Sequence, residues 1–184
     1  MRYTNLLLIV LLSVFFSNNV FSEEKIISEL KKGGKFVFIR HALAPGTGDP
    51  DNINLQDCNT QRNLDSRGIE QSKKIGEFFI KNKIPIEIVL SSEWCRCKDT
   101  AMYAFKNFKI YNALNSFYDE KFFKFKDKQI EDLNKFIKNQ KNKKNIIFIS
   151  HFVVINEILN ISSLSGEIII FDNNKDILGR IKVN

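Results

Sequence analysis

The sequence predicts a three-layer α/β/α sandwich with a mostly parallel central sheet. Three short apolar runs rich in Ile, Val and Phe are typical of strands that are buried on both faces. Segments with apolar residues at helical spacing lie between them, and strands that alternate with helices imply helices on both faces of the sheet. The chain has 184 residues, of which 43% are apolar and 27% charged, so we expect one globular domain.

The predicted elements follow from local patterns along the chain. Asp65 or Ser66 is suited to cap the first long helix, and Asn173-Asn174 is suited to turn the last hairpin. A polar loop over 42–63 follows the first strand, and a loop of that length is usually functional. In chain order the predicted elements are strand 35–39, helix 66–81, strand 86–90, helix 94–105, helix 129–138, strand 145–149 and a terminal hairpin of 167–171 with 176–183.

The first 22 residues are typical of a signal peptide. Arg2 supplies a positive start, residues 6–16 are apolar apart from Ser13, and Val20-Phe21-Ser22 is suited to cleavage after Ser22. The alternative is an uncleaved membrane anchor. No later apolar stretch reaches the roughly 18 residues that a membrane span needs. We therefore expect an exported domain over 23–184, periplasmic or secreted, without a stable span after cleavage.

Export changes the interpretation of the three cysteines. In an oxidising compartment one pair can form, and we expect Cys58 to pair with Cys95 or Cys97. A metal site is disfavoured, since Cys95 and Cys97 are two positions apart and do not share a helix face.

The positive charge of the chain comes mostly from dispersed lysines. Cleavage of the signal removes one arginine and no acid, which lowers the formal net charge from +7 to +6. The run 138–144 is typical of a solvated helix end, so the charge does not predict a nucleic-acid partner. The chain has 22 Lys but only six Arg, and four of the six arginines lie in one third of the chain. Arg offers a planar fork for phosphate or carboxylate that Lys lacks. These four are Arg40, Arg62, Arg67 and Arg96.

The only two histidines of the chain follow near-identical strands, FVFIRH (36–41) and IIFISH (146–151). Ligands of open α/β sheets bind beyond the carboxyl ends of the strands, so His41 and His151 meet if their strands are neighbours. Arg40 and Arg96 follow strand ends too, and together these groups predict a phosphate pocket. Arg62 is open to two interpretations, a tie between loop and helix or a further phosphate ligand. Residues 117–125, rich in Phe, are expected to be core or pocket wall.

Several motifs resemble those of the histidine phosphatase superfamily, which has the phosphoglycerate mutase-like fold. Arg40-His41-Ala42 resembles its RHG motif, with Ala in place of the usual Gly. The motifs Ser91-Ser92-x-x-x-Arg96-x-x-x-Thr100-Ala101 and Ser150-His151 look like its second Arg and second His motifs. The strings 41–50 and 57–64, with Ser165-Gly-Glu167, are similar to exported bacterial members that include lipopolysaccharide core heptose-phosphate phosphatases.

The resemblance implies a phosphatase that acts on a small phosphorylated substrate without metal or cofactor. His41 is implied as the nucleophile that forms a phosphohistidine, and His151 as a donor to the phosphoryl group. Arg40 and Arg96 are implied to clamp the phosphoryl oxygens. The general acid is not set by a motif, and Asp119 and Glu120 are the candidates. The alternative is a non-catalytic phosphate or sugar-phosphate binding protein that has lost this acid.

Overall fold

The computed structural model describes residues 23–183, and the predicted signal peptide lies outside these residues. A six-stranded sheet has the order β3-β2-β4-β1-β5-β6. The first four of these strands are parallel, whereas β5 and β6 form an antiparallel hairpin at one edge. The strands are β1 (Phe36–Arg40), β2 (Ile86–Ser91), β3 (Lys109–Ile110), β4 (Asn145–Ser150), β5 (Ile168–Phe171) and β6 (Ile177–Ile181).

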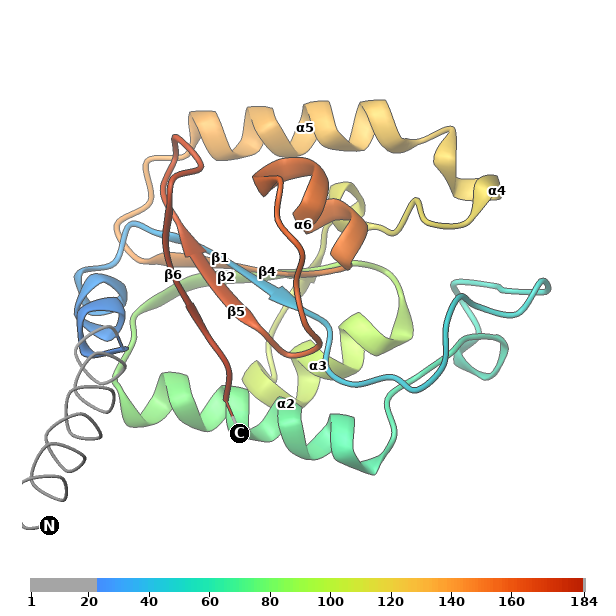
Figure 1. The fold of residues 1–184 in the computed structure, drawn as a ribbon, viewed down its shortest axis with the longest axis horizontal. Helices are drawn as coiled ribbons and strands as arrows, with labels where there is room; N and C mark the ends of the chain where they lie inside the picture. The colour runs from blue at the N-terminus through green and yellow to red at the C-terminus, as the bar shows by residue number, and fades with distance from the viewer. Residues whose placement is uncertain (1–22, 184) are drawn as a thin grey trace, which may run out of the picture.

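Helices cover both faces of the sheet, which confirms the predicted α/β/α sandwich. In Figure 1, α2 and α3 lie below the sheet, and α5 and α6 lie above it. Residues 23–32 are also helical and precede β1. The other helices are α2 (Ser66–Lys81), α3 (Cys95–Phe105), α4 (Glu120–Phe123), α5 (Lys126–Asn139) and α6 (Phe152–Leu159), with two 3₁₀ turns, η1 (Cys58–Thr60) and η2 (Asn112–Leu114).

The central strands are buried on both faces because each face has its own apolar core. Val37 and Ile39 of β1 pack on the side of α2 and α3. Their neighbours Phe36 and Phe38 point the other way, into the core under α5 and α6. All four are at most 1% exposed. Successive side chains of a strand alternate between faces, so a strand covered on both sides is apolar at every position.

Several predicted boundaries agree with the structure. Helix α2 spans the predicted residues, and the Asp65 carboxylate caps it by accepting a hydrogen bond from the Gly68 N–H at 2.9 Å. The predicted helix over 129–138 begins earlier, at Lys126. The disulfide joins Cys58 to Cys95, and Cys97 is a buried free thiol. This confirms one of the two predicted pairings.

Helix α6 was not predicted. Its sequence, FVVINEIL, is apolar at six of eight positions, so its periodicity does not distinguish a buried helix from a strand. It begins directly after His151, which is its N-cap.

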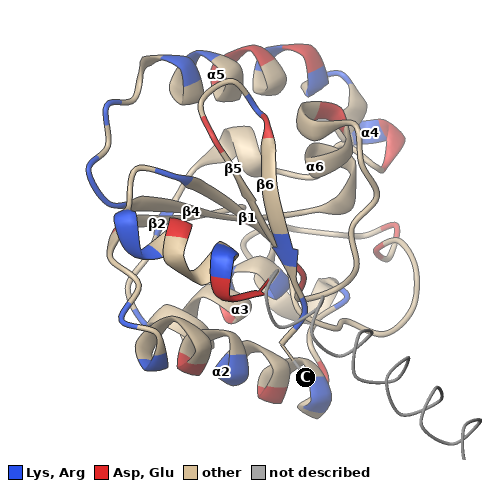
Figure 2. Ribbon diagram, turned by 60° about the vertical axis from the view of Figure 1, so that its left-hand side comes forward, with Lys and Arg blue, Asp and Glu red and all other residues tan. Residues whose placement is uncertain are grey.

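Charged side chains are distributed over the outer helices. Lys and Arg alternate with Asp and Glu along α2 and α5 (Figure 2). Within residues 23–183 no helix has both the length and the apolar character needed to cross a membrane.

Candidate active site

The two histidines meet at the carboxyl edge of the sheet. Strands β1 and β4 are parallel neighbours, and Arg40 pairs with Ser150 in their register. The residues that follow, His41 and His151, place their ring centroids 5.4 Å apart at an interplanar angle of 64°. The predicted convergence of the two histidines is therefore confirmed.

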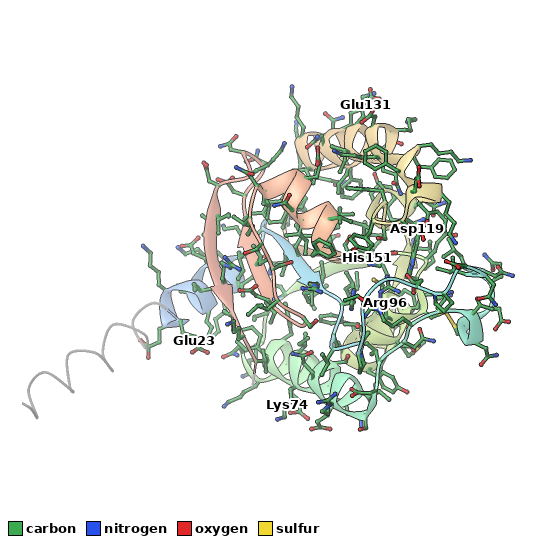
Figure 3. The ribbon with its side chains drawn as sticks, turned by 45° about the vertical axis from the view of Figure 1, so that its right-hand side comes forward. Glu23, Lys74, Arg96, Asp119, Glu131 and His151 are labelled. Carbon is green, nitrogen blue, oxygen red and sulfur yellow. A yellow bond between two sulfur atoms is a disulfide. The ribbon has the colours of Figure 1, made fainter. Side chains whose placement is uncertain are left out.

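A cavity of about 180 Å³ opens beside His41. It receives Arg40 from β1, Arg62 from the loop after β1, Arg96 from α3 and Asp119 from the segment before α4. Figure 3 shows the labelled Arg96, His151 and Asp119 at one end of the sheet, whereas Lys74 and Glu131 lie on the outer helices. The remaining lining residues are Gly46, Thr47, Gly48, Asp49, Trp94, Ser116, Tyr118 and Phe152.

Two of the predicted site residues do not line the cavity. His151 is buried against His41 and is not among the residues that line the cavity. Glu120 is exposed at the start of α4 and also lies outside the lining, so of the two candidate acids only Asp119 reaches the cavity. The predicted wall from 117–125 is present in part, through Tyr118 and Asp119.

The ring of His41 has a defined orientation. Its Nδ1 lies 2.8 Å from the Ala42 carbonyl oxygen, which can only accept, so Nδ1 carries the proton and donates. Nε2 is then the basic nitrogen of the neutral ring. Burial, and next the positive charge of Arg96, lower the pKa of His41 well below its ordinary value. The ring is therefore a neutral imidazole near pH 7, which is the nucleophilic form.

The backbone around His41 is held from two sides. The Gly166 N–H donates to the carbonyls of Arg40 at 3.0 Å and His41 at 3.3 Å. The Ala42 N–H donates to Thr100 Oγ1 in α3 at 3.0 Å. Gly166 has φ +71°, and a Cβ there would come within 2.4 Å of the Gln71 side chain. The motif residues Thr100 and Gly166 thus position His41 without touching the cavity themselves.

Arginine charge is concentrated at the cavity. Arg96 is 3% exposed, and the Nε atoms of Arg96 and Arg40 are buried without a hydrogen-bond partner in the described part of the chain. Nη1 of Arg40 donates to the Ser163 carbonyl at 2.7 Å, which orients its guanidinium. Buried guanidinium N–H groups without acceptors are suited to bind an anion.

Asp49 is a site residue that was not among the predicted site residues. Its two carboxylate oxygens accept from Arg96 Nη1 at 2.8 Å and Nη2 at 3.1 Å. They also accept from Trp94 Nε1 at 3.1 Å and from the Arg62 N–H at 3.1 Å. Burial alone would raise the pKa of Asp49, but the hydrogen bonds and charge of Arg96 outweigh it and lower that pKa. The signals for Asp49 in the sequence were the length of the loop that carries it and its place in the string 41–50, to which no role was assigned.

Arg62 lines the cavity and also braces its own loop. Its Nε donates to the Gly48 carbonyl at 2.8 Å, and its Nη1 donates to the Ala44 carbonyl. The predicted tie between loop and helix is made instead by its backbone, because the Arg62 carbonyl accepts from Arg96 Nη1 at 3.3 Å. The Cys58–Cys95 disulfide adds a covalent tie between this loop and α3, one residue before Arg96.

His151 is surrounded by positive charge. Burial, then Arg96, then His41 and the other two arginines lower its pKa well below the ordinary value. Both histidines are therefore uncharged near pH 7. Among residues 23–183, no three His, Cys, Asp or Glu side chains gather as metal ligands would.

The strand order, the helix layers and the site at the sheet edge define a phosphoglycerate mutase-like fold. Solved structures with this fold align over most of the chain. The protein histidine phosphatase SixA in complex with tungstate shares 16% identity, with 80% of this chain and 96% of that chain covered and a TM-score of 0.57.

Two further structures are similar to the same degree. Phosphoglycerate mutase from Thermus thermophilus shares 15% identity, covering 82% of this chain and 99% of that one, with a TM-score of 0.58. A protein from Escherichia coli K-12 proposed to be an α-ribazole-5′-P phosphatase shares 16%, covering 83% and 96%, with a TM-score of 0.57. No protein-family model and no curated protein matches the sequence. The similarity therefore shows the fold.

Proposed function

We propose that this protein is an exported histidine phosphatase that hydrolyses phosphate monoesters through a phosphohistidine on His41. The observation that carries the proposal is the neutral His41 ring, with Nδ1 held by the Ala42 carbonyl, on the wall of a cavity lined by three arginines. A nucleophile without charge, faced by groups that bind a dianion, is the arrangement that phosphoryl transfer needs.

The reaction proceeds in two transfers. Nε2 of His41 attacks the phosphorus atom, an N–P bond forms, and the ester P–O bond breaks. The guanidinium groups of Arg40 and Arg96 neutralise the charge on the equatorial oxygens, which supplies most of the catalysis in such a transfer. Water then attacks the phosphorus atom, the N–P bond breaks, and inorganic phosphate leaves with His41 restored. These residues supply the positive charge, so no step requires a metal.

Asp119 is the residue proposed to protonate the leaving alcohol. It lines the cavity, whereas its neighbour Glu120 is exposed. We expect Asp119→Asn to lower kcat by about 100-fold for an alkyl phosphate such as glycerol phosphate, whose leaving group needs a proton. The effect on p-nitrophenyl phosphate is expected to be small, because p-nitrophenolate leaves unprotonated. Glu120→Gln is the matched control, and an equal loss in both variants would contradict this assignment.

The substrate is proposed to be a sugar phosphate or a phosphate of the lipopolysaccharide core. The support is the similarity of the segments 41–50, 57–64 and 165–167 to the corresponding segments of exported members of the superfamily. A periplasmic or secreted location is proposed from residues 1–22 together with the disulfide, since disulfides persist in oxidising compartments.

The test is hydrolysis of p-nitrophenyl phosphate by the purified protein in EDTA, with His41→Ala beside it. We expect turnover that survives chelation and is lost in the variant. Brief reaction with a ³²P-labelled substrate should also leave alkali-stable, acid-labile phosphate on the wild type only. The alternative is a phosphate-binding protein without activity. It would show no turnover in either form, while tungstate or phosphate still raises the Tm of both.

A further inference from the structure

A hydrogen-bonded chain leads from His151 away from the cavity to Glu93. Ser92 Oγ lies 2.9 Å from His151 Nε2 and donates to Asn115 Oδ1 at 3.2 Å. Asn115 Nδ2 in turn donates to the Glu93 carboxylate at 2.6 Å. Ser92, Asn115 and His151 are each at most 8% exposed. Buried polar groups that are connected in this way hold one another in a single arrangement.

The contacts of Glu93 determine the orientation of the Asn115 amide. Its Oδ1 accepts from the Glu93 N–H at 2.9 Å, and its Nδ2 faces the Glu93 carboxylate. A flipped amide would set donor against donor and acceptor against acceptor, so its orientation follows from the contacts of Glu93. Oδ1 has no proton, so its 3.2 Å contact with Ser92 Oγ is a hydrogen bond only when Ser92 donates its hydroxyl proton to it.

With its proton on Asn115, Ser92 Oγ can only accept from its other neighbours. These are the Trp94 N–H, which donates to it at 3.3 Å, the Cys97 thiol, and His151 Nε2 at 2.9 Å. In this arrangement Nε2 carries the imidazole proton, which leaves Nδ1 as the bare nitrogen of the neutral ring. His41 has the opposite arrangement, with its proton on Nδ1.

We propose that Glu93 and Asn115 are positioning residues which, through Ser92, hold His151 as its Nε2–H tautomer. Nδ1 is then left free for an oxygen of a phosphoryl group bound at His41, whose ring centroid lies 5.4 Å from that of His151. The proposal rests on the proposed function for the identity of the bound group. When a phosphate monoester binds as its monoanion, its one proton passes to Nδ1, which then donates it in a hydrogen bond to the phosphoryl oxygen of the resulting dianion. The Glu93 carboxylate stabilises the resulting cation along the chain. The other ionisable groups near His151 are Arg40, His41, Arg62, Arg96 and Cys97, whose Sγ lies 3.5 Å from Nε2.

The sequence indicated only part of this hydrogen-bonded chain. Glu93 stands in a variable position of the motif Ser91-Ser92-x-x-x-Arg96, and Asn115 follows η2 in a segment without a motif. Only the fold brings Asn115 to within hydrogen-bond distance of both Ser92 and Glu93, 23 and 22 positions away.

The test is the ¹⁵N NMR spectrum of the histidine rings at neutral pH. Because the protein contains two histidines, the spectrum resolves two rings, and the variant His151→Gln shows which signals belong to which ring. We expect opposite tautomers, Nδ1–H for His41 and Nε2–H for His151. This measurement needs no turnover, so it can fail while the phosphatase proposal stands, and it can succeed if that proposal fails. An Nδ1–H tautomer at His151 in the wild-type protein would overturn the inference.

Variants test whether the chain sets the tautomer. In Asn115→Ala the Ser92 hydroxyl loses its acceptor and is free to donate to Nε2, so the His151 signals should shift toward Nδ1–H and kcat should fall by about tenfold. The double variant Glu93→Gln/Asn115→Asp reverses the polarity of the outer pair but keeps an acceptor for Ser92, and should restore both readouts. Asn112→Ala, in η2, is the matched control. Unchanged His151 signals in a folded Asn115→Ala variant would contradict the proposal, and unchanged His41 signals would show that the site is intact.

Discussion

The ends of β1 and β4 are nearly the same in sequence but differ in the segment that follows each histidine and in the hydrogen bonds of its ring. Both strands are buried, lie side by side and end in a histidine, with Arg40 paired to Ser150. After His41 the chain enters a long polar loop, and Nδ1 donates to the Ala42 carbonyl. After His151 it enters α6, and Nε2 is held by Ser92. The proposed tautomers leave opposite ring nitrogens free, and under the proposed function Nε2 of His41 attacks while His151 stabilises the charge.

The largest expected difference between the two strand ends is in catalysis. We expect His41→Ala to lower kcat for p-nitrophenyl phosphate by at least about 10⁴-fold, because the variant has no nucleophile. Steady-state kinetics measure this loss. Residual turnover within tenfold of the wild type would contradict the role of His41 as nucleophile and the proposed difference between the two histidines.

His151→Ala should have a smaller effect on the same reaction. Removal of one donor to the charge that develops in transfer lowers kcat by about 10²–10³-fold. The His41 nucleophile remains, so phosphohistidine should still be trapped in this variant. Absence of the phosphorylated form would contradict the proposed roles of His41 as nucleophile and His151 as hydrogen-bond donor.

A substitution at Asp49 tests how much the long loop after β1, which has no counterpart after β4, contributes to stability. Asp49 pairs with Arg96, and the two side chains are 10% and 4% exposed. Asp49→Asn leaves a buried guanidinium without its counterion, and we expect the free energy of unfolding to fall by about 3 kcal/mol. Urea unfolding measures the change, and tungstate should restore more stability in the variant than in the wild type. Asp51→Asn, an exposed neighbour in the same loop, is the control.

The pH dependence of stability tests whether both rings are buried as neutral groups. Their pKa values are lowered in the folded state, so the unfolded chain binds more protons below about pH 6.5. Stability is complete above that pH and falls as the pH decreases, by up to about 1.4 kcal/mol per pH unit for each histidine. Urea unfolding between pH 6.5 and 5 measures the slope. His151→Gln should remove about half of it, and a flat profile in the wild type would contradict the burial of neutral rings.

The elements that the sequence predicted well are those with a strong local signal. Helix α2 was predicted to both ends because its apolar stripe and the Asp65 cap are local features. Helix α6 was missed since its run of Val and Ile suits a buried strand equally well. Arg40, His41 and Arg96 were found because each follows a predicted strand end and belongs to a motif.

The sequence by itself determined the layers of the fold, the two strand ends and the arginines that gather there. These depend on periodicity and on residue chemistry over a few positions. The tertiary structure decided that Cys58 pairs with Cys95, that Asp49 meets Arg96 and that Asn115 meets Ser92. Such pairs are 23 to 47 positions apart. Their contacts depend on the path of the folded chain, which no local pattern contains.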